Sequence, residues 1–152
     1  MPNTYTQIHI HFVFAVKYRK SVITNEWENE LYKYITGVIQ NNDHKLLIIN
    51  GMPDHDPILL GLRPSQSISD LMKDVKQSSS KWLNKNKFTQ SHFEWQEGGA
   101  FSYSKSQVKS VINYIQNQKI HHNKKSFLEE YKEILTKFEI EWDEKYIFKE
   151  MI

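Results

Sequence analysis

Hydrophobic and polar residues follow two different periods along this chain. Residues 5–16 alternate between the two classes and are rich in aromatic and β-branched side chains, a pattern typical of a strand. Helical spacing then places Trp27, Leu31, Ile35 and Val38 on one face. Further along, short apolar runs separated by a Gly-Met-Pro-Asp turn indicate a hairpin.

Together these patterns predict the element order β-α-β-β-α-β, the α+β unit called ferredoxin-like, with an antiparallel sheet. Thr24 or Asn25 is the candidate cap of the first helix, and Ser67 begins the second. The predicted elements cover residues 5–16, 25–42, 45–50, 58–62, 67–83 and 93–96. Two more helices are predicted over about 105–121 and 126–138.

The length of 152 residues suits one domain, 1–152, with a core over 1–97 and the additional C-terminal helices within 104–152. Gly98 and Gly99 are expected to form a joint that lets the next helix swing or reach a partner subunit. We expect a homodimer, because the last helix carries an apolar stripe larger than a small sheet can cover. The stripe consists of Phe127, Tyr131, Ile134, Leu135 and Phe138.

Composition sets limits on the class of protein. Lys and Arg outnumber Asp and Glu by 20 to 18, so the net charge of +2 does not by itself indicate a nucleic-acid partner. The absence of cysteine excludes disulfides, thiolate metal sites and cysteine nucleophiles, and it fits a reducing cytoplasm. No apolar run approaches the ~20 residues of a membrane span, and the N-terminus lacks the pattern of a signal peptide. A cytoplasmic location is therefore expected.

Two segments carry the candidate chemistry. His55 begins a predicted strand after a turn, on the same side as residue 57, and two histidines at those positions would make half a metal site. Position 57 is a proline. In the predicted helix after residue 105, Tyr114 and Gln118 lie one turn apart and would present a phenol and an amide from one face.

The order of these segments resembles that of the single-tyrosine HUH transposases of the insertion-sequence 200/605 type, where HUH means His, hydrophobic residue, His. The similar segments are residues 10–20, 52–60, 98–102 with Ser104, 114–118 with His121 and His122, and 139–148. The resemblance implies cutting and rejoining of single-stranded DNA through a covalent phosphotyrosine, by a dimer with a divalent metal. It implies Tyr114 as the nucleophile, His55 as a metal ligand and Gln118 as a third ligand or orienting group.

This chain departs from the motif at two positions. Pro57 stands where the second histidine is expected, and Asp56 where the hydrophobic residue is expected. Imidazole and amide ligands suit Mg²⁺ or Mn²⁺, with a lean toward Mn²⁺. Two replacement ligands are candidates: His11, on the neighbouring first strand, and Asp56, if Pro57 bulges its own strand. With one motif histidine missing, weak or absent strand cleavage is expected.

DNA contacts are predicted from basic residues close to an aromatic one, since these can bind phosphates and stack an unpaired base. The candidates are Lys17, Tyr18, Arg19, Lys20, Lys73 and Lys76. Three hypotheses remain open: a transferase of single-stranded DNA with hairpin recognition, a catalytically inactive DNA-hairpin-binding protein of the same fold, and an interaction module without DNA. The position of Pro57 bears on the choice between the first two.

Overall fold

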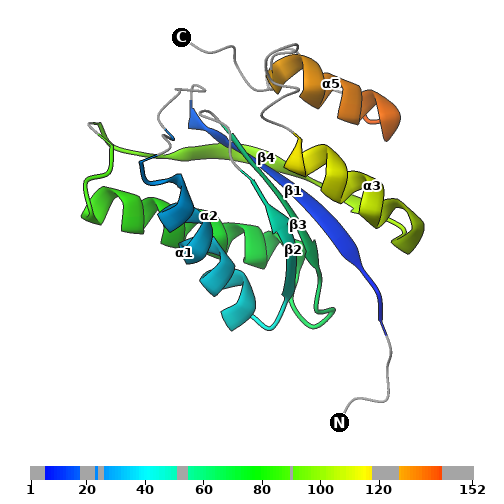
Figure 1. Cartoon of the computed structure of the whole chain (residues 1–152), viewed down its shortest axis with the longest axis horizontal. Helices are drawn as coiled ribbons and strands as arrows, with labels where there is room; N and C mark the ends of the chain where they lie inside the picture. Colours follow the sequence, from blue (N-terminus) through cyan, green and yellow to red (C-terminus); the bar gives the residue numbers. More distant parts are fainter. Residues whose placement is uncertain are drawn as a thin grey trace.

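The computed structural model describes residues 6–17, 23, 26–50, 55–89, 91–117 and 127–141 (Figure 1). Its elements are β1 (His9–Val16), α1 (Glu28–Asn41), β2 (Lys45–Ile49), β3 (His55–Gly61), α2 (Ile68–Lys85), β4 (Trp95–Tyr103), α3 (Lys105–Gln116) and α5 (Phe127–Lys137). The strands form one antiparallel sheet in the order β2-β3-β1-β4. This is the ferredoxin-like arrangement, and the predicted fold is confirmed.

Helices cover both faces of the sheet. The helices α1 and α2 lie on one face, and α3 and α5 lie on the other (Figure 1). On β1, Phe12 and Phe14 belong to the core beneath α1 and α2, whereas Val13 and Ala15 pack with residues of α5. Because successive side chains of a strand point to opposite faces, both faces of β1 are buried. The odd-numbered positions of β1 therefore face α3 and α5.

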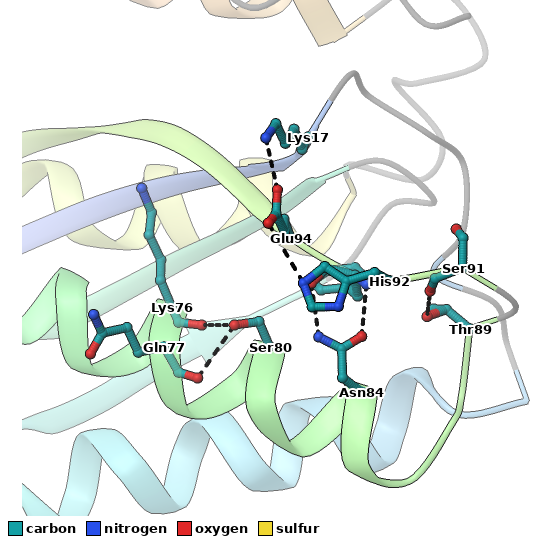
Figure 2. Close-up of polar contacts among 10 residues, drawn as sticks. Lys17, Lys76, Gln77, Ser80, Asn84, Thr89, Ser91, His92 and Glu94 are labelled. Carbon is teal, nitrogen blue, oxygen red and sulfur yellow. Dashed lines mark hydrogen bonds and ion pairs between the residues drawn. The ribbon is translucent and has the colours of Figure 1, made fainter.

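The second helix is held at both ends by side-chain hydrogen bonds. The Ser67 hydroxyl accepts a hydrogen bond from the Asp70 backbone N–H at 3.0 Å, so Ser67 caps the helix as predicted. At the other end the Asn84 amide accepts from the Phe93 N–H at 2.7 Å and donates to the Phe93 carbonyl at 3.0 Å (Figure 2). These two bonds tie the end of α2 to the approach of β4.

The start of α1 differs from the prediction. The residue that caps it is Trp27, which makes no capping hydrogen bond with its side chain. The indole is buried and stacks on Phe88 with ring centroids 5.8 Å apart. The helix therefore begins at a buried, packed aromatic residue. The predicted caps, Thr24 and Asn25, lie outside the described residues.

Gly98 and Gly99 lie inside β4 and do not form the expected joint. The pairing of β4 with β1 shifts register between Val13 and Ala15, which marks an irregularity next to these glycines. A Cβ atom at Gly98 would lie 2.1 Å from the carbonyl oxygen of Val13, so only glycine fits this close backbone approach. The sheet therefore continues to Tyr103, past the boundary expected at residue 97.

Part of the apolar stripe of the last helix packs on the chain's own sheet. Tyr131 and Leu135 are buried against Val13, Ala15 and Phe101. This packing accounts for the apolar character of these two positions without a second subunit. None of the helices in the described residues has the length and apolar character needed to span a membrane.

Replacing Gly98 by alanine should destabilise the fold, because the new methyl group would collide with the Val13 carbonyl. We expect a loss of about 1–3 kcal/mol in the free energy of unfolding, measured by urea denaturation. Gly37→Ala in α1 is the matched control, since nothing lies within 4 Å of its added Cβ. That variant should be neutral or more stable by about 0.5–1 kcal/mol. Equal stability of Gly98→Ala and wild type would contradict the close approach.

Candidate metal and tyrosine site

The pairing of β1 with β3 determines which side chains share the site. Ala15 lies opposite His55, Val13 opposite Pro57, and His11 opposite Leu59. All six positions are on the sheet face that carries α3 and α5. His11 and His55 are both buried there.

A small cavity of about 10 Å³ lies above Pro57. It is about the size of one water molecule or one ion. The cavity is lined by His11, Val13, His55, Pro57, Tyr114, Glu130, Tyr131 and Ile134. Two strands and two helices thus bring both histidines, a carboxylate and the candidate nucleophile to one place. Tyr114 stands over the strand of its own chain that carries His55.

A larger cavity of about 240 Å³ adjoins the small one. The two share His11, Tyr114, Glu130 and Ile134 in their walls. The larger cavity also contacts Tyr103 and Lys137, whose ammonium lies 5.8 Å from the centre of the Tyr103 ring. Tyr114 is half-buried between these cavities and can be approached from the larger one.

His11 is buried without a hydrogen-bond partner for either ring nitrogen among the residues that the structure describes. Burial, followed by the charge of nearby His55, lowers the pKa of His11 from 6.5 to about 4. The imidazole is therefore neutral at pH 7 and keeps a lone pair available. That is the protonation state in which a histidine binds a metal ion.

The prediction that Asp56 is a replacement ligand is wrong. Asp56 pairs with Phe14, and the register between β1 and β3 runs without a shift across Pro57. Since Pro57 does not bulge its strand, alternation points Asp56 to the face covered by α1 and α2. Proline is tolerated at this position because it lies at the end of the β2–β3 pairing, where its carbonyl accepts from the Asn50 N–H at 3.2 Å and no ladder partner requires an N–H from residue 57.

Within the described ranges, no group of three His, Cys, Asp or Glu side chains could hold a metal ion. The small cavity is bordered by His11, His55 and Glu130, but His11 lies opposite Leu59 and is four residues along the strands from His55. Gln118, the ligand that the resemblance implies, lies outside the described residues.

Sequence reasoning missed Glu130. This carboxylate is buried, and it lies on α5 one turn from Ile134, on the face that packs against the sheet. A glutamate within an otherwise apolar helix face was the available sign of a polar site beneath that helix.

The residues predicted to contact DNA lie on different parts of the fold. The Lys17 ammonium lies 2.8 Å from a Glu94 carboxylate oxygen, and His92 lies 3.6 Å from the other oxygen (Figure 2). The hydrogen bond and charge of Lys17 lower the pKa of Glu94, so the lysine charge is compensated. Lys73 and Lys76 lie on α2, on the opposite side of the sheet from Tyr114 (Figure 1). The segment 18–20 lies outside the described residues.

A basic cleft lies near the first turn of α3. Its volume is about 330 Å³, and its walls include Lys45, Arg63 and Lys105 with one acidic residue, Asp43. The Arg63 guanidinium donates to the Asn42 carbonyl at 3.0 Å and to the Ser65 hydroxyl, so its position is defined. Three distant segments supply these cations, and no local sequence pattern indicated the cleft.

Fold and site together define a class: a ferredoxin-like sheet that presents a tyrosine from an added helix to histidines on the central strands. Residues 4–118 match the family described as Transposase IS200 like. The chain belongs to this transposase family.

Known proteins similar to the chain agree with the family. The ISDra2 transposase TnpA of Deinococcus radiodurans is 31% identical over 75 residues, which are 49% of this chain and 54% of that protein. The chain thus matches about half the length of this curated relative. A solved transposase structure from Deinococcus radiodurans R1 has a TM-score of 0.64 and 22% identity, covering 78% of this chain and 95% of that one.

A tyrosine transposase solved in complex with a REP hairpin also shares the fold. The TM-score is 0.61 and the identity is 13%, with 80% of this chain and 73% of that chain covered.

Acid should destabilise the metal-free protein through His11. Between pH 6.5 and about 4 the unfolded histidine binds a proton that the folded one excludes, so stability falls as the pH drops through this window. At pH 4 the accumulated cost is on the order of 3 kcal/mol. Urea denaturation of wild type and His11→Gln, with a chelator present, measures this cost in the free energy of unfolding. The stability difference between the two proteins should change across this window and stay constant above it; a constant difference throughout would contradict the burial of a neutral His11.

Proposed function

We propose that this chain is a DNA strand transferase that acts on single-stranded DNA through Tyr114. The phenol oxygen would attack the scissile phosphorus and form a 5′-phosphotyrosine, while the bond to the 3′ oxygen breaks. The phenol loses a proton, and the leaving 3′ oxygen gains one. The supporting observation is that Tyr114 borders the same cavity as His55 of its own chain.

A tyrosine with its usual pKa near 10 is a weak nucleophile at neutral pH, so the site has to favour attack in other ways. A divalent cation, Mg²⁺ or Mn²⁺, would neutralise charge on the phosphate when bound. By the family resemblance, His55 and Gln118 would hold it. The packing of α3 on β3 holds Tyr114 at the cavity that His55 also borders, which reduces the entropy cost of bringing the reacting groups together.

Recognition of a DNA hairpin with a single-stranded flank is part of this proposal. The neighbour in complex with a REP hairpin has the same fold, which supports it. The basic cleft is on the α3 side of the sheet, where phosphates flanking the scissile bond would run. A homodimer and a cytoplasmic location also belong to the proposal, on the family resemblance. A monomer by light scattering at tens of micromolar would count against the dimer.

A second candidate function is hairpin binding without cleavage. The observation that favours it is Pro57, which occupies the motif position of a metal ligand and has no donor atom in its side chain. DNA binding through backbone contacts does not need that ligand, so it would survive.

Strand cleavage should depend on Tyr114 and improve when the motif is restored. We expect Tyr114→Phe to abolish the covalent protein–DNA adduct, and Pro57→His to raise adduct formation about 10- to 100-fold by adding a ligand. The measurement is a denaturing gel of a labelled hairpin oligonucleotide with Mn²⁺, with mass spectrometry to locate the modified residue. If neither wild type nor Pro57→His forms an adduct, the binding-only candidate is favoured.

Hairpin affinity should depend on the cations of the cleft. Lys45→Ala and Lys105→Ala are each expected to weaken binding and to reduce the slope of log affinity against log salt by about 0.7–0.9 for each lost phosphate contact. Lys73→Ala, on the opposite side of the sheet, is the comparison variant. A loss of affinity from Lys73→Ala alone would place the DNA on α2, as the sequence predicted, and not in the cleft.

A further inference from the structure

The larger cavity beside Tyr114 contains a buried polar side chain without a partner. The volume of this cavity is about 240 Å³, many times the ~10–15 Å³ that one water molecule needs. His11, which is only 2% exposed, lies in its wall, and neither ring nitrogen of this histidine has a hydrogen-bond partner among the described residues. Burying such a group costs free energy unless a ligand completes its hydrogen bonds. The cavity is therefore a candidate binding site for a polar molecule.

The rest of the lining combines apolar surface with negative charge. Val111 of α3, Ile134 of α5 and the half-buried ring of Tyr103 supply apolar and aromatic surface. The buried carboxylate of Glu130 and the exposed carboxylate of Glu133 supply the negative charge. Negative charge disfavours a phosphate inside the cavity, whereas aromatic and apolar walls suit a flat, uncharged ring. The lining thus fits a nucleobase better than a phosphate.

The position of Tyr114 relates this cavity to the DNA strand. Tyr114 borders both the larger cavity and the small cavity that His55 lines. A phosphate attacked by the phenol would therefore lie beside the larger cavity, and the base of an adjoining nucleotide can enter it. Lys137 is an exposed cation in the same lining and is the candidate partner for the phosphate of that nucleotide.

The two buried polar side chains indicate which edge of a base would bind. A neutral imidazole offers one N–H donor and one acceptor, whereas a carboxylate only accepts and has about four lone-pair sites. Adenine and cytosine carry an amino group next to a ring nitrogen, so the amino group can donate to Glu130 while the ring nitrogen accepts from His11. Thymine carries a carbonyl oxygen on each side of its ring N–H, and the carboxylate would face one of these oxygens. The lining therefore favours a base with an amino group.

We propose that the cavity lined by α3 and α5 binds the base of an unpaired nucleotide next to the scissile phosphate, and that it prefers adenine or cytosine to thymine. Glu130 accepts from the amino group, His11 donates to the ring nitrogen, and the base packs against Tyr103. Only an unpaired base has this edge available, so the site fits single-stranded DNA. The inference rests on the proposed function for its place beside the scissile phosphate, but binding of the base can be measured without cleavage.

Two short single strands, one of deoxycytidine and one of deoxythymidine, test the preference with bases of similar size. Binding is measured by fluorescence anisotropy, with a chelator present to suppress cleavage. Wild type should bind the deoxycytidine strand at least about 5-fold more tightly, which is the lower end of the discrimination that one pair of hydrogen bonds to a base provides. Glu130→Gln should remove most of this preference, and Glu129→Gln, the exposed neighbour on α5, should keep it. Equal affinity of wild type for the two strands, or an unchanged preference in Glu130→Gln, would overturn the proposal.

Filling the cavity provides a second test. Ser110 is an exposed residue of α3 that belongs to the lining, so Ser110→Trp should block entry without disturbing the buried core. Affinity for the deoxycytidine strand should fall at least about 5-fold, because stacking of a single base contributes this much or more. Asn113→Trp, exposed on the same helix and outside the lining, should bind as wild type does. Equal affinity of Ser110→Trp and wild type would contradict the proposal.

A measurement on wild type guards against variants that fail to fold. When the deoxycytidine strand is added, the methyl NMR signals of Val111 and Ile134 should shift, because both side chains line the cavity. The methyl signals of Ile35, in the core under α1 and α2, should stay in place. Unchanged signals of Val111 and Ile134 at a concentration where the strand is bound would overturn the proposal.

None of these assays requires strand cleavage, so they separate the base site from the proposed function. A cytosine preference that depends on Glu130, in a protein that forms no covalent adduct, would support the base site and count against strand transfer alone. An adduct at Tyr114 in a protein without base preference would support strand transfer and overturn the base site.

Discussion

The antiparallel pairing of β1 with β3 is the constraint on which the rest of the site depends. Side chains alternate between faces, so a shift of one residue in either strand would move its histidine, His11 or His55, into the core under α1 and α2. The observed register places both on the face of α3 and α5 instead. Buried apolar side chains on both faces of β1 stabilise this register, because any slip would bury the wrong set.

Two further contacts position the helices over that face. The close approach at Gly98 lets β4 pair with β1 up to Tyr103, and α3 begins two residues later. Tyr131 of α5 packs near the same part of β4, where its hydroxyl lies 2.7 Å from a Cβ placed on Gly99. The backbone geometry of β4 and the packing of α5 thus belong to one unit. Through it, Glu130 and Tyr114 reach the cavity.

The sequence predicted the order of the elements and indicated His55 and Tyr114 as site residues, because periodicity and local motifs report on single elements. It was wrong where the outcome depends on contacts between elements. Asp56 was expected to rotate toward the site, but continuous pairing with Phe14 holds it in the opposite core. The glycine pair was interpreted as a joint, although the Val13 carbonyl opposite Gly98 is the reason for it. Glu130 was missed, since only the docking of α5 places it near the histidines.

The central claim is the proposal that Tyr114 acts together with His55 of the same chain, since both border one cavity. A mixture of Tyr114→Phe and His55→Ala, assayed for the covalent adduct with a hairpin oligonucleotide and Mn²⁺, tests it most directly. The account predicts that the mixture forms no more adduct than either variant alone. Recovery of the adduct in the mixture would contradict it, because the tyrosine of one chain would then serve the histidine of another.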